Sequence, residues 1–243
     1  MKEIKYSCED LEHTANYKLL HSNKKYPRPR PSGVYYWHIS NFTPDMEKEK
    51  VILAFNRAWN IWQEAMDAIY PQGRYITFMT TSELHKADFI ITFGKGFHEF
   101  PDALGSTHTC PFPFDGQKGI LAHAWALTTA KPFGGQMHCD EDENWSEMQL
   151  GDRNPNKTDL LTTIIHEIGH MLGLDHSEIE SAMMGMHYNG VKIHLHEDDH
   201  QGLTKRFLDV KGDAARKQGW VRPKSLEKKK SWWSRLLSWL HIK

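Results

Sequence analysis

Apolar and polar positions alternate in several short runs of the 243-residue chain and recur at helical spacing in three longer ones. Alternation rich in aromatic and β-branched residues is typical of strands, whereas apolar residues every three or four positions indicate amphipathic helices. The first helical pattern follows Pro44. The pattern therefore predicts an α+β domain. Its expected strands lie within residues 33–40, 74–81, 87–93, 119–127 and 135–141, and its later helices lie near 157–172 and 196–208.

Two extensions flank the predicted domain. Residues 1–33 are polar and mixed in charge, and they end in a proline-rich connector, YPRPRPSG. Residues 211–243 combine a lysine run with an amphipathic stripe of tryptophan and leucine. This stripe is compatible with binding to a membrane surface, with docking on a partner or with packing against the domain. We therefore expect one domain at residues 34–210 between the two extensions.

Composition argues against several classes of protein. A formal net charge of −1 gives no reason to expect nucleic-acid binding. No apolar run has the length of a signal peptide or a membrane span, so we expect a chain made in the cytoplasm, with membrane association or release by a non-Sec route left open. The three cysteines cannot build a disulfide framework, although one pair is possible.

The most informative motif is HEIGHMLGLDH, which begins at His166. His166 and His170 project from one face of the predicted helix, where two imidazoles can share a metal ion. Glu167 falls on the same side, close enough to hold a water bound to that metal. Gly173 lets the chain leave the helix, so that His176 can return to the site. Any one of these histidines could be an ordinary helix residue, but the full pattern arises by chance in such a chain with a probability on the order of 10⁻³ or less.

Motifs on either side of this segment resemble the catalytic domain of the matrix metalloproteinases, the matrixin branch of the metzincins. The segments PFDGQKGILAHAWA, HCDEDENW and LHEDDHQGLTKRF match successive family motifs, and the similarity runs from about Val34 to Asp209. The resemblance implies a metzincin, zincin-like α+β fold with three helices and a twisted, mostly parallel five-stranded sheet. It also implies that a substrate lies extended along the edge strand at residues 119–124.

The same resemblance implies that His166, His170 and His176 ligate a catalytic zinc. It implies a zinc-dependent endopeptidase that cleaves protein or peptide substrates through a zinc-bound water, with Glu167 as general base. The alternative is a non-catalytic binding or structural protein that a metal stabilises, but such a protein has no need of Glu167. Family spacing also places Met184 in the Met-turn below the zinc. It places the wall of the main substrate pocket, without the usual proline, at Met186, His187 and Tyr188.

A second zinc site is implied at three further histidines and a cysteine. Counting back from PFDG makes His108 its first ligand, with His98 as a rival. Cys110 stands where the family has an aspartate, and zinc accepts a thiolate readily. The alternative is a disulfide between Cys110 and Cys139, which is disfavoured because Cys139 would point away from the metal side of its strand. The implied ligands are therefore His108, Cys110, His123 and His138.

The resemblance finally implies a calcium site, which requires oxygen ligands because calcium is a hard cation. A solvated acidic loop without a cation is the alternative. A second family calcium site is in doubt, because Gln136 replaces an aspartate after the GG pair. The implied ligands are the carboxylates of Asp115, Asp140 and Glu143 and the carbonyls of Gly116, Lys118 and Ile120.

Overall fold

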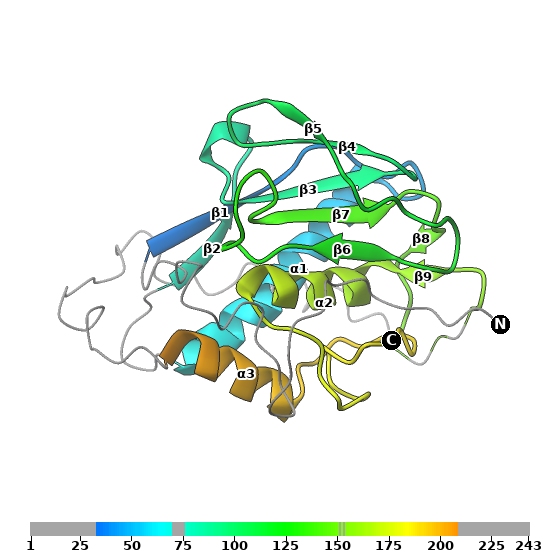
Figure 1. Ribbon diagram of the computed structural model, residues 1–243. Helices are drawn as coiled ribbons and strands as arrows, with labels where there is room; N and C mark the ends of the chain where they lie inside the picture. Colours follow the sequence, from blue (N-terminus) through cyan, green and yellow to red (C-terminus); the bar gives the residue numbers. More distant parts are fainter. Residues whose placement is uncertain (1–32, 70–75, 151, 153, 209–243) are drawn as a thin grey trace.

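The computed structural model describes residues 33–69, 76–150, 152 and 154–208. The predicted extensions lie almost entirely outside the described residues, so docking of the C-terminal tail on a membrane or partner stays a prediction. The described residues form three α-helices and one main sheet (Figure 1). Among these residues, no helix combines the length and the apolar character that a membrane crossing requires.

The main sheet has five strands in the order β2-β1-β3-β7-β6. β1 pairs in parallel with β2 and β3, and β3 pairs in parallel with β7. Within this sheet only the edge strand β6 runs antiparallel to its neighbour. The predicted five-stranded, mostly parallel sheet is therefore confirmed. Its strands are β1 (Gly33–Ile39), β2 (Ile76–Thr80), β3 (Phe89–Gly94), β6 (Ala122–Ala124) and β7 (Gln136–Asp140).

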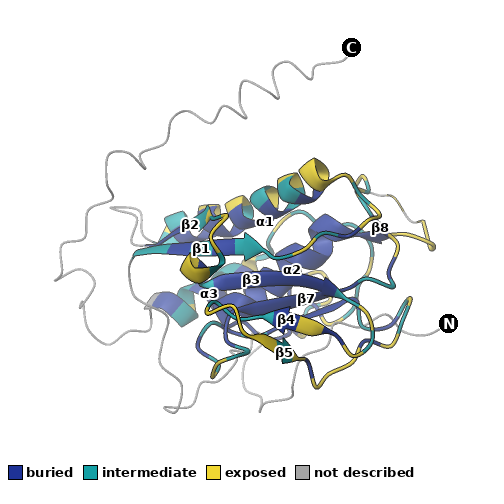
Figure 2. Ribbon diagram, turned by 90° about the horizontal axis from the view of Figure 1, so that it is seen from above, coloured by how far each residue is buried: buried dark blue, intermediate teal, exposed yellow. Residues whose placement is uncertain are grey.

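Helices α1 (Lys48–Ile69) and α2 (Leu160–Leu172) pack against each other, and α3 (Glu197–Leu208) contacts α1. In the view of Figure 1, α2 lies below the sheet and α1 runs diagonally behind the strands. α1 buries one apolar face, as its periodicity predicts, and Figure 2 shows the opposite face exposed. From the buried face, Trp62 Nε1 donates a hydrogen bond of 2.8 Å to the carbonyl oxygen of Ile165. This bond fixes α1 against the middle of α2.

α2 starts later than the sequence predicts, because Asp159 caps its N-terminus. The Asp159 carboxylate accepts the backbone N–H of Thr162 at 2.8 Å and so satisfies one of the unpaired donors of the first turn. Thr158–Asp159 form the short strand β9, which pairs with β8 (Trp145–Ser146). Every residue of α2 is buried. The helix that carries the HEIGH motif therefore runs through the core, where an unpaired charge is costly.

A short hairpin occupies the segment 94–119, for which the sequence predicts irregular structure. It consists of β4 (Glu99–Pro101) and β5 (Thr107–Thr109), and it lies above the sheet in Figure 1, on the side away from α2. The Asp102 carboxylate closes its turn by accepting the N–H groups of Leu104 and Ser106, at 2.8 and 2.9 Å. The 3₁₀ turn η1 (Leu84–Lys86) precedes β3.

Candidate metal centres

His166 and His170 face each other one turn apart on α2, and both are fully buried. The Nδ1 atom of His166 donates to the carbonyl oxygen of Met183, and that of His170 donates to the carbonyl oxygen of Leu174, each at 2.8 Å. The two Nε2 atoms lie 2.9 Å apart. Because each ring carries its proton on Nδ1, both Nε2 atoms present lone pairs to one point.

Burial keeps these imidazoles neutral. It lowers the pKa of His166 and of His170 well below the ordinary value, and the neighbouring imidazoles lower both further. Two neutral acceptor nitrogens at such close range repel each other unless a cation lies between them. The site therefore fits a metal ion that accepts imidazole ligands, and zinc is one such ion.

Gly173 brings the third histidine back to the site. It ends α2 with a φ of 97°, in the left-handed region that glycine enters without steric cost. A Cβ atom at this position would also lie 2.5 Å from Nε of Arg206 on α3. After this turn the His176 ring centroid lies 5.3 Å from that of His166 and 4.9 Å from that of His170. The three predicted ligands converge as one cluster.

Glu167 is buried next to this cluster. Neither of its carboxylate oxygens has a hydrogen-bond partner among the residues that the structure describes. Burial raises its pKa well above the ordinary value of a carboxyl group. A buried acceptor without a protein partner is costly unless a ligand or a water satisfies it. Glu167 is therefore a buried acceptor whose satisfaction requires a ligand or a water.

Met184 packs closely against α2. A Cβ atom at Gly169 would be 2.3 Å from the Met184 sulfur, so glycine is needed inside the helix for this close approach. The Met184 carbonyl oxygen accepts the N–H of Ser177 at 2.7 Å, which joins the methionine segment to the residue after the third histidine. Met184 therefore packs closely on α2 at Gly169, and its role in a Met-turn below the metal stays a prediction.

A second cluster is formed by His98, Cys110, His123 and His138, all buried. Nδ1 of His138 lies 2.8 Å from Nε2 of His98 and 3.1 Å from Nε2 of His123, and the Cys110 sulfur lies 3.5 Å from the same His123 nitrogen. Burial lowers the pKa of His123 to about 3 and lowers those of His98 and His138, while it raises the pKa of Cys110. Three imidazoles and a thiol converge as the four ligands of a closed zinc site do.

The prediction that His108 belongs to this cluster is wrong. His108 lies two residues before Cys110 and is opposite Phe100 in the hairpin register. Its Nε2 is 2.9 Å from a carboxylate oxygen of Asp102. The Phe100 ring packs on the His138 ring with a centroid distance of 4.5 Å, and it occupies the space between His108 and the cluster. His98 takes the place instead, because the antiparallel register sets it opposite Cys110.

The alternative disulfide is also contradicted. Cys110 and Cys139 are both free thiols. Cys139 follows His138 on β7, and successive strand residues point to opposite faces. The Cys139 thiol faces the α2 side of the sheet, where burial and then the nearby Glu167 carboxylate raise its pKa well above the ordinary value.

The predicted calcium ligands lie on the loop at residues 115–120 and around the end of β7. The Asp115 carboxylate accepts the N–H of Ile120 at 2.8 Å, and the Glu143 carboxylate accepts the N–H of Lys118 at 2.6 Å. Asp140 is buried, and its Oδ2 has no hydrogen-bond partner within the described ranges. Burial, together with the charges of Asp142, Glu143 and Asp115, raises the pKa of Asp140 to about 7. A cation at this point would bind the unpaired Oδ2 of Asp140 and would stabilise the charged form of its carboxylate.

The loop around this site is tightly curved. Gly116 and Lys118 both have positive φ angles, of 81° and 62°. The Asp115 carboxylate occupies the space that a side chain at Gly119 would need, since a Cβ there would lie 2.1 Å from its oxygens. Gln136 is buried, and its Nε2 donates to the carbonyl oxygen of Pro101 on β4 at 3.0 Å, while its Oε1 has no hydrogen-bond partner among the described residues.

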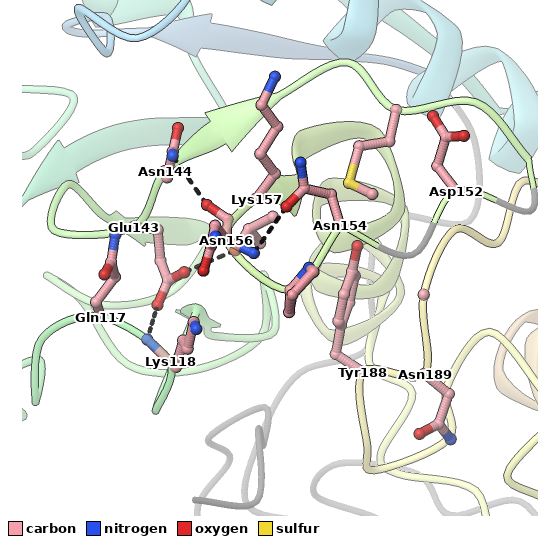
Figure 3. A pocket seen from close by; sticks show the side chains of 14 residues that line it. Gln117, Lys118, Glu143, Asn144, Asp152, Asn154, Asn156, Lys157, Tyr188 and Asn189 are labelled. Carbon is pink, nitrogen blue, oxygen red and sulfur yellow. Dashed lines mark hydrogen bonds between the residues drawn. The ribbon is translucent and has the colours of Figure 1, made fainter. Parts of the chain in front are cut away.

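A pocket of about 440 Å³ lies between the calcium-site loop and the predicted pocket wall (Figure 3). Its lining comes from residues 117–118, from residues between 143 and 158, and from residues 188–190. Tyr188 stands at this pocket, and its hydroxyl accepts the backbone N–H of Asp159 at 3.0 Å. Met186 is 39% exposed, and His187 Nδ1 lies 2.8 Å from a carboxylate oxygen of Glu180. The wall is therefore attached both to the start of α2 and to the segment before the Met-turn.

The fold and the two histidine clusters define a metzincin-type zinc-protein architecture. A sequence model of the matrixin family matches residues 30–207, and the chain belongs to that family. It is 34% identical to macrophage metalloelastase from Oryctolagus cuniculus, over 70% of this chain and 32% of the relative. It is 34% identical to matrix metalloproteinase-16 from Homo sapiens, over 70% of this chain and 26% of the relative. It is 33% identical to karilysin from Tannerella forsythia, over 68% of this chain and 29% of the relative. The chain thus spans about a quarter to a third of the length of these relatives.

Proposed function

We propose that this chain is a zinc-dependent endopeptidase. The observation that carries the proposal is the fully buried Glu167, which follows the first of three converging imidazoles in the sequence and whose carboxylate has no partner among the described residues. A metal held for stability alone needs four protein ligands and no neighbouring base. Membership of the matrixin family and the names of the relatives, which are those of metalloproteinases, support the same conclusion.

The proposed chemistry assigns a proton transfer to Glu167. His166, His170 and His176 would hold the zinc, which when bound lowers the pKa of a water and polarises the carbonyl of the scissile peptide bond. Glu167 accepts the proton of the attacking water and returns it to the leaving amine. General acid–base assistance of this kind contributes about 10²- to 10⁴-fold to the rate.

The edge strand β6 supports an extended peptide as substrate. β6 is the last strand in the order of the sheet, so its outer edge is available for backbone pairing with a strand-like segment. β6 also contacts α2, the helix that carries His166 and His170, which supports a substrate bound along this strand. Backbone pairing does not depend on side chains, and we therefore infer that the wall at Met186, His187 and Tyr188 sets the preference for particular substrates.

Two further cations are proposed for stability. A zinc ion would be held by His98, Cys110, His123 and His138, where it would join the base of the β4–β5 hairpin to β6 and β7. A calcium ion would be held at Asp115, Asp140 and Glu143, where it would offset the burial and the charge repulsion that together raise the pKa of Asp140.

Hydrolysis of quenched fluorescent peptides by the purified chain tests the proposal. We expect turnover with zinc, its loss on treatment with a zinc chelator, and its recovery on addition of zinc in the presence of calcium. Turnover that survives complete removal of zinc would contradict the proposal. A folded, zinc-loaded chain that cleaves no peptide would favour the alternative of a metal-stabilised binding protein.

A further inference from the structure

Lys192 connects the substrate-pocket loop to two other segments. Its ammonium group donates to the carbonyl oxygens of Glu180 and Ala182, at 2.7 and 2.9 Å. Its backbone N–H donates to the hydroxyl oxygen of Thr162 at 2.9 Å, and its carbonyl oxygen is 3.1 Å from the same hydroxyl. Thr162 lies in the first turn of α2, one turn before His166. Lys192 is therefore bonded both to the helix of the metal site and to the segment that leads into the Met-turn.

The carbonyl of Ala182 belongs to the first of two peptide groups that support His166. The N–H of this first group, on Met183, donates to the Asp199 carboxylate at 2.9 Å. In the second group, the Met184 N–H donates to the other Asp199 oxygen at 3.0 Å, and the Met183 carbonyl accepts Nδ1–H of His166 at 2.8 Å. Lys192 and Asp199 thus bind the first peptide group at its two ends, and Asp199 and His166 bind the second.

This arrangement gives Lys192 an influence on a metal ligand that it does not touch. A partner on the Nδ1 side of a ligating histidine fixes the orientation of the ring and the tautomer, and loss of such partners typically weakens metal binding or activity about 10- to 100-fold. Hydrogen bonds at one end of a peptide group also polarise the other end. Without the cation, the Ala182 carbonyl would keep only the N–H of Gly185 as a donor, at 3.1 Å. The two peptide groups that orient His166 would then be held less firmly, by Asp199 alone on their N–H side.

The same cation also holds the pocket wall. The Glu180 carboxylate binds Nδ1 of His187 and Nδ2 of Asn189, at 2.8 and 3.1 Å, while the Glu180 carbonyl binds Lys192. Lys192 is half-buried, and burial lowers its pKa while the charges of Glu180 and Asp199 act in the opposite direction. Because the ammonium group is partly removed from water and bonded to two carbonyl oxygens, the Lys192 side chain is held in one conformation.

We propose that Lys192 is a positioning residue of the catalytic centre, which fixes the peptide groups that orient His166 and at the same time anchors the substrate-pocket wall. The proposal rests on the proposed peptidase function for its kinetic consequence. Its structural consequence, the retention of zinc by the three histidines, does not depend on that function.

The test compares two variants of Lys192. Lys192→Met removes the cation, whereas Lys192→Arg keeps the positive charge and at least two N–H donors. Lys50→Met is the matched control, since the Lys50 side chain is 52% exposed in the first turn of α1. Each variant of the full chain is loaded with zinc. The measurements are kcat and KM for a fluorescent peptide and the rate of zinc release to a chromophoric chelator. Zinc bound at the two sites should be released in two kinetic phases. The phase that is absent in His166→Ala is the one that belongs to the catalytic site.

We expect Lys192→Met to lower kcat about tenfold with a smaller change in KM, and to speed zinc release from the catalytic site about tenfold. Lys192→Arg should recover most of both losses, and Lys50→Met should match the parent chain. If Lys192→Met does not fold, Lys192→Gln, which keeps a neutral donor, takes its place in the test. We expect its losses in kcat and in zinc retention to be larger than those of Lys192→Arg but smaller than those expected for Lys192→Met.

Two results would overturn the proposal. One is a folded Lys192→Met chain whose kcat and zinc release both stay within about twofold of the parent. The other is equal damage in Lys192→Arg and Lys192→Met, which would assign the effect to packing of the lysine stem. If the parent chain cleaves no peptide, the proposed function fails, and the zinc-release measurement alone decides the role of Lys192.

Discussion

The backbone N–H of Cys110 donates to the carbonyl oxygen of His98 across 2.8 Å, at the base of the β4–β5 hairpin. This bond sets His98 and Cys110 opposite each other on the two arms of the hairpin, and both side chains lie beside His123 and His138. His108 is two residues further along and is paired with Asp102. The identity of the second metal site therefore depends on the hairpin register.

The register leads to a prediction for a pair of histidine variants. His98→Ala should lose the second zinc and lower the melting temperature, because it removes one of four buried ligands and leaves the others without a cation. His108→Ala should keep both zinc ions, because it removes only a partly exposed contact to Asp102. Metal content by mass spectrometry, with thermal unfolding, checks both variants. The reverse pattern would restore the family spacing and refute the ligand set proposed above.

A second pair of variants tests the thiolate. Cys110→Ala should destabilise the domain and weaken the second zinc by about 100-fold or more, since a ligand loss exceeds the 10- to 100-fold cost of losing an outer partner. Cys139→Ala removes an equally buried thiol from the opposite face and should leave the zinc content unchanged. X-ray absorption should detect one sulfur at about 2.3 Å from zinc in the parent chain. A zinc-loaded parent without that sulfur would eliminate Cys110 as a ligand.

The sequence was sufficient for the metal-site helix but not for the hairpin. The spacing of His166, Glu167 and His170 is a local property of one helix, and Gly173 marks the turn that returns His176. The position of His98, by contrast, depends on how two strands pair across a turn closed by the Asp102 carboxylate. Such pairing is not local, so the sequence alone does not show whether His98 or His108 lies beside Cys110 in the cluster.

The sequence does not reveal the residues that support the site. Asp199 lies within the LHEDDHQGLTKRF segment and Lys192 in no motif, and both bond to backbone groups of the Met-turn segment, which any residue type presents. Only the folded structure shows that these peptide groups are the ones next to His166. The short strands β8 and β9 were missed for a related reason, since two-residue strands contain too few positions for a periodic pattern.

Calcium binding should depend on pH through Asp140. Its pKa of about 7 in the folded chain lies above the usual value of 3.8, so the folded state holds this proton more tightly than the unfolded state does. Without calcium, the contribution of Asp140 to stability therefore falls as the pH rises from about 4 through 7. Calcium competes with the proton, so its stabilising effect should grow over the same range.

The increase in melting temperature that calcium produces, measured at pH 5.5 and at pH 8, checks this prediction. The increase should be larger at pH 8. Asp140→Asn should abolish most of it, whereas Asp142→Asn should not, because the Asp142 carboxylate is more exposed and pairs with Lys95. An equal calcium effect at the two pH values would show that Asp140 is not a ligand.

The role of Glu167 as general base is the central claim. Replacement by alanine removes the proton acceptor and no metal ligand, so Glu167→Ala should keep the fold and the full zinc content. Its rate of peptide hydrolysis should fall by about 10²- to 10⁴-fold. Loss of zinc in this variant would instead mean that Glu167 is a ligand.

Mass-spectrometric mapping of cleavage in a proteome-derived peptide library, with the zinc-loaded parent and the zinc-loaded Glu167→Ala chain side by side, tests this claim most directly. We predict that the parent produces new peptide ends with a shared preference around the cleaved bond, and that these ends are almost absent with Glu167→Ala and after chelation of zinc. Similar cleavage by the two zinc-loaded chains, or no cleavage by a folded and zinc-loaded parent, would contradict it.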